Sequence, residues 1–160
     1  MASKYAHTKP LNTVSVILMD EKDRILTVQS GNSQSLIGGW ITRDYDGNHS
    51  LEKAVDSAYI KIAQETNNGD DPISVENFYR NHNIQIMDSF SYDMGKYGHL
   101  VTIARYLPGD VPLVGNTDLA DRYIVHNHKW LNLADFDSNE IKRCSRMDIR
   151  KMVSRGIPLF

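Results

Sequence analysis

The sequence predicts one domain of the α/β (α+β) class, and three observations support this. The chain has 160 residues, which is one domain's length at roughly 100–200 residues per domain. Short apolar runs rich in β-branched residues alternate with polar turns, which is the pattern of strands. One longer segment spaces its apolar residues by three and four positions, as an amphipathic helix does. We therefore expect a single domain over residues 1–160, with strands and helices around one core.

Two strands and one long helix are expected in the first half of the chain. Residues 13–19 and 24–29 are apolar and β-branched, and the polar residues 20–23 between them have turn composition, so the pair is expected to form a hairpin. A further short strand is expected at 40–42. An N-cap at Ser50 begins a helix that runs to about Thr66. Its apolar face consists of Leu51, Ala54, Val55, Ala58 and Ile62.

The second half is expected to be mostly sheet. A short helix is predicted at 74–79, followed by strands at 84–92 and 100–106 that are joined through a turn containing Gly95. A last short strand is predicted at 128–131. The expected order is therefore hairpin, helix, antiparallel strands and a terminal helix.

The terminal helix carries the basic patch of the chain. It is expected to begin at the N-cap Ser145, to run through Ser154 and to stop at Gly156. Cations near a helix C-terminus are favourable, so a solvated helix end is the first interpretation, and a phosphate-rich partner is the second. The patch consists of Lys142, Arg143, Arg146, Arg150, Lys151 and Arg155, with Glu140 and Asp148 as the opposing charges.

Composition limits the partners and the compartment. A formal net charge of −2 gives no general attraction to nucleic acid or to anionic membranes, so neither is an expected partner unless a local patch binds it. No apolar run approaches the roughly 20 residues that a membrane span needs. Cys144 is the only cysteine, which suits a reducing compartment, and residues 1–10 lack the apolar core of a signal peptide. A cytoplasmic protein is expected.

Four segments occur in a recognisable order along the chain. They are the run TVSVILMDEKDRILTVQSG, Trp40, a helix ending in Gln64-Glu65-Thr66-Asn67, and HKWLNLADF before the last helix. Together they resemble the Nudix hydrolases over nearly the whole chain. The resemblance implies an α/β/α sandwich with a mixed sheet, and a homodimer is common in that family. It also implies a helix that presents carboxylates to Mg²⁺ or Mn²⁺, which clamp a diphosphate while water attacks phosphorus.

The residues that match the Nudix box lack much of its acidic cluster. With about one inserted residue, Glu52 and Glu65 match two of its glutamates, whereas Lys61 and Gln64 stand where it has glutamates. An ungapped register is worse, because it places Ala58, Lys61 and Ile62 at the acidic positions. Other departures from the box are Asp46 and Asn67 for glycines and Ile60 for arginine.

This replacement changes the chemistry that the helix can support. Lys61 lies one helical turn from Glu65 and would place a fixed cation where the family binds its metal. A lysine cannot ligate magnesium. If the protein is active, Glu65, Glu52 and Gln64 are the candidate metal ligands, but a site with so few carboxylates would bind Mg²⁺ weakly unless substrate phosphates help.

Further candidates follow from the position of other segments in the resemblance. Arg43 and Tyr45 occupy the loop that shapes the family's site and are candidate ligand contacts with Lys61; a plain polar loop is the alternative. Asp118 and Asp121 lie where the family often places an extra catalytic acid, so they join Glu65 and Glu52 as catalytic candidates, with a solvated loop as the alternative. Trp40 and Trp130 are expected in the core, because large aromatic side chains are mostly buried.

Two functions follow from this. The first is a Nudix-fold protein that binds a nucleotide or nucleotide-like ligand, needs no cofactor and has weak or no ordinary pyrophosphohydrolase activity. The second is an active, divergent hydrolase that uses Mg²⁺ or Mn²⁺ to cleave a nucleoside diphosphate linked to another group, such as a nucleotide sugar. An altered box does not by itself exclude activity, because a branch of the family that hydrolyses GDP-sugars also has one.

Overall fold

The structure is a computed structural model that describes residues 5–30, 32–41, 83–107 and 125–156. The helices expected at 50–66 and 74–79 lie outside these residues. Among the described residues, no helix has the length and apolar character that a membrane span needs.

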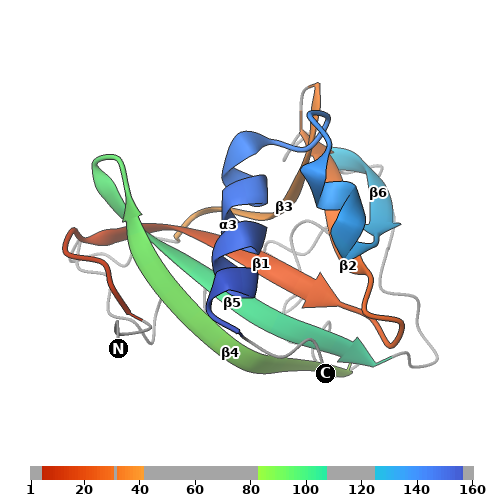
Figure 1. The fold of residues 1–160 in the computed structure, drawn as a ribbon, viewed down its shortest axis with the longest axis horizontal. Helices are drawn as coiled ribbons and strands as arrows, with labels where there is room; N and C mark the ends of the chain where they lie inside the picture. Colours follow the sequence, from red (N-terminus) through yellow and green to blue (C-terminus); the bar gives the residue numbers. More distant parts are fainter. Residues whose placement is uncertain (1–4, 31, 42–82, 108–124, 157–160) are drawn as a thin grey trace, which may run out of the picture.

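In the described residues, six strands form one mixed sheet (Figure 1). Their spatial order is β4-β5-β1-β3-β2-β6, with β1 and β5 parallel and the other neighbours antiparallel. The predicted α/β (α+β) class with a mixed sheet is therefore confirmed. The strands are β1 (Leu11–Met19), β2 (Ile25–Ser30), β3 (Ser33–Trp40), β4 (Asn83–Met94), β5 (Tyr97–Leu107) and β6 (Val125–Leu131).

The turn between β1 and β2 forms where the sequence predicts it. Asp20 Oδ1 accepts hydrogen bonds from the backbone N–H groups of Lys22 and Arg24, both at 2.9 Å, and Asp20 Oδ2 binds the Arg24 guanidinium at 2.7 Å. The predicted hairpin is wrong, however, because the two strands pair only at Met19 and Ile25. Beyond this point they diverge and β3 lies between them.

Strand β3 is the main element that the sequence analysis missed, since only a short strand at 40–42 was expected. Polar and glycine residues over most of its length hide the alternation of a half-buried strand. Gly38 is needed there because β3 crosses close to β1: a Cβ on Gly38 would lie 2.3 Å from the carbonyl oxygen of Val14. The missing side chain lets the two backbones approach.

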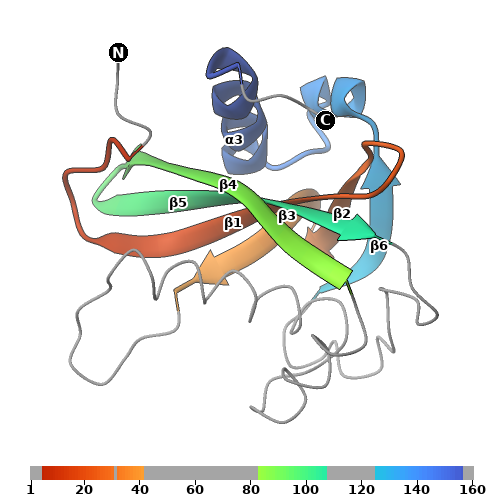
Figure 2. The same ribbon diagram turned by 90° about the horizontal axis from the view of Figure 1, so that it is seen from below.

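Two apolar clusters lie on opposite faces of the sheet, because successive side chains of a strand alternate between its faces. Figure 2 shows α3 (Arg143–Ser154) over one face, together with the short 3₁₀ helix η2 (Leu133–Asp137). The cluster on the α3 face contains Ile17, Met19, Ile25, Leu36, Phe90, Tyr92, Val101, Ile103, Phe136, Ile141, Ile149 and Met152. The cluster on the other face contains Leu11, Val14, Val16, Leu18, Leu26, Val28, Ile37, Ile41, Leu100, Ala104 and Tyr106.

Helix α3 ends as expected and begins differently. It runs through Ser154, and Gly156 adopts a left-handed φ of 64° just beyond it. Ser145 is not the N-cap, because the helix begins at Arg143 and Ser145 lies inside it. The buried Ser145 Oγ instead accepts a hydrogen bond from the backbone N–H of Leu36 at 3.0 Å, which ties α3 to β3.

The two tryptophans have different surroundings. Trp130 packs against the cluster on the face opposite α3 and stacks on Tyr106, with ring centroids 6.3 Å apart, as expected for a core residue. Trp40 does not lie in the core, because 58% of its surface is exposed. It is the last residue of β3, and its ring packs edge to face against the Tyr97 ring, with ring centroids 5.8 Å apart.

Candidate functional site

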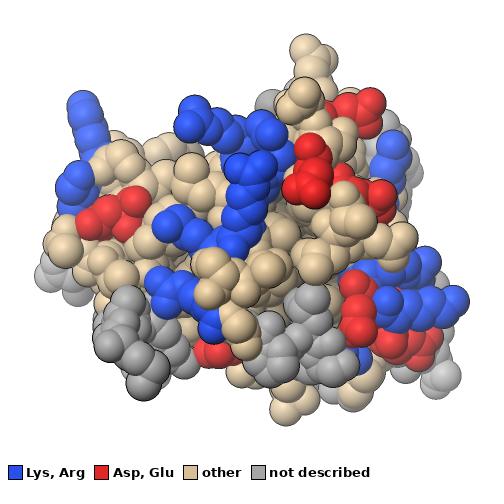
Figure 3. All heavy atoms as spheres, viewed as in Figure 1, with Lys and Arg blue, Asp and Glu red and all other residues tan. Residues whose placement is uncertain are grey.

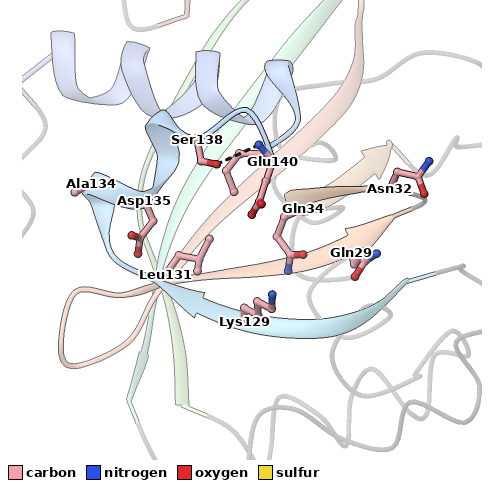
Figure 4. Close-up of a pocket in the computed structure, with 10 residues that line it drawn as sticks. Gln29, Asn32, Gln34, Lys129, Leu131, Ala134, Asp135, Ser138 and Glu140 are labelled. Atoms are coloured by element: carbon pink, nitrogen blue, oxygen red, sulfur yellow. Dashed lines mark hydrogen bonds between the residues drawn. The ribbon is translucent and has the colours of Figure 1, made fainter.

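A polar pocket of about 600 Å³ lies between β2, β3, β6 and the segment around η2 (Figure 4). Pockets for small molecules occupy roughly 300–1,000 Å³, so this one has room for a ligand of nucleoside size. Its lining residues are Gln29, Asn32, Gln34, Lys129, Leu131, Ala134, Asp135, Ser138, Glu140 and Ile141.

The floor of the pocket is held by hydrogen bonds from three strands. Gln34 Nε2 donates to Thr27 Oγ1 at 3.0 Å, and Thr27 Oγ1 donates to the carbonyl oxygen of Lys129 at 3.0 Å. Thr27 is fully buried, so this chain of bonds fixes the Gln34 amide to β2 and connects β2 to β6. The Gln34 backbone also bonds to Glu140 O at 3.0 Å and to Lys142 N at 2.7 Å. The segment before α3 is thereby attached to the edge of the pocket.

Hydrogen bonds between residues close in sequence position the acidic side of the pocket around η2. Asp135 Oδ2 accepts from the backbone N–H of Asn132 at 2.9 Å, and Ser138 Oγ accepts from the backbone N–H of Glu140 at 3.2 Å. Figure 4 shows the Glu140 carboxylate and the Lys129 amine extending toward each other, with Gln34 between them. The pocket therefore presents groups of both charges and an amide within one space.

This lining suits one part of a nucleotide better than another. Amides of Gln29, Asn32 and Gln34 supply both donors and acceptors, as the edge of a heteroaromatic base requires. The lining carries one cation, Lys129, against two carboxylates, so it disfavours a group with several negative charges. The lining therefore favours a neutral polar group over a diphosphate.

A second polar cluster lies beneath α3 and is buried. Asp148, which has no exposed surface, accepts a hydrogen bond from the Tyr92 hydroxyl on its Oδ1. Its Oδ2 lies 3.2 Å from His99 Nε2, and the other ring nitrogen of His99 lies 2.6 Å from Thr13 Oγ1. Burial, and then the charge of Asp148, raise the pKa of Tyr92. The Lys151 amine also covers the Tyr92 ring, 4.4 Å from its centroid.

The buried cluster holds α3 in place and does not form a ligand site. Its carboxylate contacts side chains of both β4 and β5, so it fixes the helix to two strands at once. Its inaccessibility to solvent leaves no path by which a ligand could reach Asp148. The open pocket is therefore the candidate site of the described chain.

Comparisons with known proteins identify the type of fold. No protein-family model and no curated protein sequence matches this chain. A NUDIX hydrolase from Nitrosomonas europaea has a similar structure, with a TM-score of 0.55, 11% identity, and 92% of this chain and 90% of that chain covered. The MutT protein from Methanosarcina mazei Go1 gives a TM-score of 0.51 at 14% identity, covering 96% and 100%. A C. elegans Ap4A hydrolase gives 0.52 at 12% identity, covering 89% and 96%.

This chain has the Nudix fold. The similarity to these structures extends over most of the chain, so the resemblance seen in the sequence is confirmed at the level of the fold. At 11–14% identity the comparisons carry the fold and not the activity.

The Nudix-box candidates stay predictions, because none of them is among the described residues. In the part of the chain that the structure describes, no three His, Cys, Asp or Glu side chains come together to hold a metal ion. The candidate residues that lie outside the described ranges are Arg43, Tyr45, Glu52, Lys61, Gln64, Glu65, Asp118 and Asp121.

The polar pocket itself was missed by the sequence analysis. Its residues come from β2, β3, β6 and η2, and the expected hairpin did not place β2 beside β3. One signal was present: Gln29 is a polar residue in the mostly apolar run of β2, and it lies directly opposite Gln34 in the β2 and β3 pairing. Their pairing register is not visible in the sequence alone.

Proposed function

We propose that this Nudix-fold chain binds a nucleotide or nucleotide-like ligand and has weak or no ordinary pyrophosphohydrolase activity. The observation that carries the proposal is the polar pocket, whose size and mixture of amides and charges suit a base. The fold supports it as well, since a structure of this fold is an Ap4A hydrolase in a binary complex.

The proposal divides the ligand between two groups of residues. The base enters the pocket, where Gln34, Lys129 and Glu140 read its polar edge. The phosphates stay outside this pocket, because two carboxylates face one cation there. Arg43 and Lys61 are the proposed phosphate contacts, and Tyr45 is a proposed third ligand contact. All three are predictions from the sequence, because they lie outside the described residues.

Weak hydrolysis follows from the sequence of the box. Lys61 and Gln64 stand at positions where the family has metal-binding glutamates, so the carboxylates for Mg²⁺ are fewer. The second candidate function, a divergent hydrolase, is favoured by the two glutamates that are kept, Glu52 and Glu65. In that case Glu52, Gln64 and Glu65 would hold the metal, which would supply Lewis-acid chemistry, and Asp118 or Asp121 would be the base that accepts a proton from water.

A thermal-shift screen tests the proposal. Nucleotides, dinucleotides and nucleotide sugars are added with and without Mg²⁺, and the recovered ligand is analysed for cleavage. A ligand at 100 times its Kd stabilises a protein by about 2.7 kcal/mol, which is a rise in Tm of roughly 5–10 °C for a domain of this size. We expect such a rise without Mg²⁺, with the ligand intact.

Matched variants link the shift to the pocket. Lys129→Gln removes the pocket cation and should reduce the shift, whereas Lys22→Gln removes an exposed cation in the turn between β1 and β2 and should not. A shift that requires Mg²⁺ and is accompanied by product would favour the divergent hydrolase. Absence of a shift with every compound would contradict nucleotide binding.

A further inference from the structure

The exposed side of α3 carries several basic side chains. The helix buries Ser145, Asp148, Ile149 and Met152 against the sheet. On the opposite side, Arg143, Arg146 and Arg150 recur at spacings of three and four, so they form one stripe that spans about 10 Å at 1.5 Å per residue. Figure 3 shows Lys and Arg side chains gathered across this face of the molecule.

In the part of the chain that the structure describes, no acidic side chain forms an ion pair with a cation of this stripe. Asp148 lies on the buried side of the helix with Tyr92 and His99, and Glu140 lines the pocket. The ion pairs of the described residues involve Asp20, Asp23 and Asp148, and none of them includes a cation of the stripe. Arg143 and Arg150 are exposed, whereas Arg146 is half-buried and donates from its Nη1 to Asn139 Oδ1 at 3.4 Å. The stripe therefore keeps a positive charge, in a chain whose formal net charge is −2.

Helix electrostatics does not explain why these cations lie where they do. Cations stabilise the C-terminal turn of a helix and destabilise the N-terminal turn, where the macrodipole is positive. Lys142 is the N-cap of α3, Arg143 is its first residue, and the first turn contains no acidic residue. The sequence analysis explained the cations as complementing the dipole at the helix C-terminus. That explanation therefore applies to Lys151 and Arg155 only. The basic N-terminal half costs stability and calls for another reason.

An exposed aromatic pair lies on the same face of the sheet as α3. Thr13 is opposite Trp40 in the pairing of β1 with β3, and its hydroxyl contacts His99, the residue that reaches Asp148 of α3. Tyr97 lies two residues before His99 and shares its face of β5. Trp40 and Tyr97, which are 58% and 43% exposed, therefore lie on the α3 side of the sheet.

We propose that the outer face of α3 and the Trp40–Tyr97 pair bind single-stranded nucleic acid. Proteins that bind single strands combine cations that follow the phosphate backbone with aromatic side chains on which bases stack, and both occur here on one face. An anionic membrane fits less well, because Val153 is the only large apolar side chain of α3 that is strongly exposed. This surface is separate from the ligand pocket, so its test does not depend on the proposed nucleotide binding.

Fluorescence anisotropy with a labelled 12-nucleotide strand of mixed sequence, as DNA and as RNA, tests this on the full chain. We expect measurable binding at 50 mM salt and at least a tenfold weaker affinity at 200 mM, because phosphate contacts release counterions. Arg143→Gln with Arg150→Gln should weaken binding at least tenfold and flatten the salt dependence. Trp40→Ala should weaken binding several-fold while leaving the salt dependence unchanged, because base stacking involves no counterion release.

Controls separate lost binding from lost folding. The double arginine variant removes cations from the exposed helix face, so its Tm should stay the same or rise. Lys22→Gln, an exposed cation in the β1–β2 turn, should bind the strand as the unchanged protein does. The proposal is overturned if no strand binds at 50 mM salt, if Lys22→Gln weakens binding as much as the double variant, or if vesicles with anionic lipid bind more tightly than the strand.

Discussion

The two polar clusters on the α3 side of the sheet contain similar groups and have different roles. The pocket has carboxylates at Asp135 and Glu140 that are exposed to water. The cluster under α3 has one carboxylate, Asp148, which no water reaches and whose two oxygens both have protein partners. Solvent exposure therefore distinguishes the two clusters. An exposed carboxylate can exchange water for a ligand, whereas a buried carboxylate keeps its protein partners.

The difference in solvent exposure also predicts different contributions to stability. A buried polar group that loses its partner pays its full desolvation cost, whereas an exposed group exchanges its partner for water. The contacts of Asp148 should consequently matter for stability, and those of Glu140 should matter for binding. The predictions below test this contrast, beginning with the largest effect.

Removal of the buried carboxylate should have the largest effect on stability. Asp148→Ala leaves the Tyr92 hydroxyl without its acceptor beneath α3 and opens a small cavity. We expect a loss of at least about 1–3 kcal/mol in the free energy of unfolding, the cost of one unsatisfied buried group. Urea denaturation monitored by circular dichroism measures it. A loss no larger than that of a surface alanine substitution would show that the cluster does not anchor the helix.

The position of Asp148 also shows how much of this site the sequence could predict. The sequence analysis counted Asp148 as an opposing surface charge of the basic patch. Its spacing of three from Ser145 and four from Met152 places it on the buried side of α3, so helical periodicity did contain the signal. Its partners on β4 and β5 lie 56 and 49 residues away along the chain, and no local pattern indicates such contacts.

The fold was predictable where the patterns are local. Apolar runs located β1, β2, β4 and β5, and periodicity with Gly156 located the end of α3. The insertion of β3 between β1 and β2 is a pairing between distant positions, and the polar side chains and Gly38 along β3 conceal it. The pocket depends on that insertion, which is why the fold could be predicted better than the site.

The second prediction concerns high pH. Burial, and then the charge of Asp148, raise the pKa of Tyr92 above its ordinary value of about 10, so the folded protein keeps a proton that the unfolded chain loses. This contribution to stability is complete below about pH 10 and falls above it, by up to about 1.4 kcal/mol per pH unit.

Tyr92→Phe isolates this contribution, because phenylalanine has no proton to lose. The variant should be less stable at pH 8, since Asp148 then lacks its hydroxyl donor. Its difference from the unchanged protein should shrink as the pH rises from 10 to 11. Urea midpoints at pH 8, 9, 10 and 11 measure this. A difference that stays constant over the whole range would mean that Tyr92 ionises as readily in the folded protein as in the unfolded chain.

The smallest effect on stability is expected in the pocket. Glu140 is exposed, so Glu140→Ala should change the free energy of unfolding by no more than about 0.5 kcal/mol. The same truncation at Asp148 costs several times more, which makes the two variants a matched pair. Glu140→Ala also removes one of the proposed contacts to the base, so the ligand-induced rise in Tm should be smaller than in the unchanged protein. Unfolding curves and ligand-induced shifts in Tm measure the two effects separately. A large loss of stability in Glu140→Ala would mean that the pocket acid, like Asp148, serves the fold.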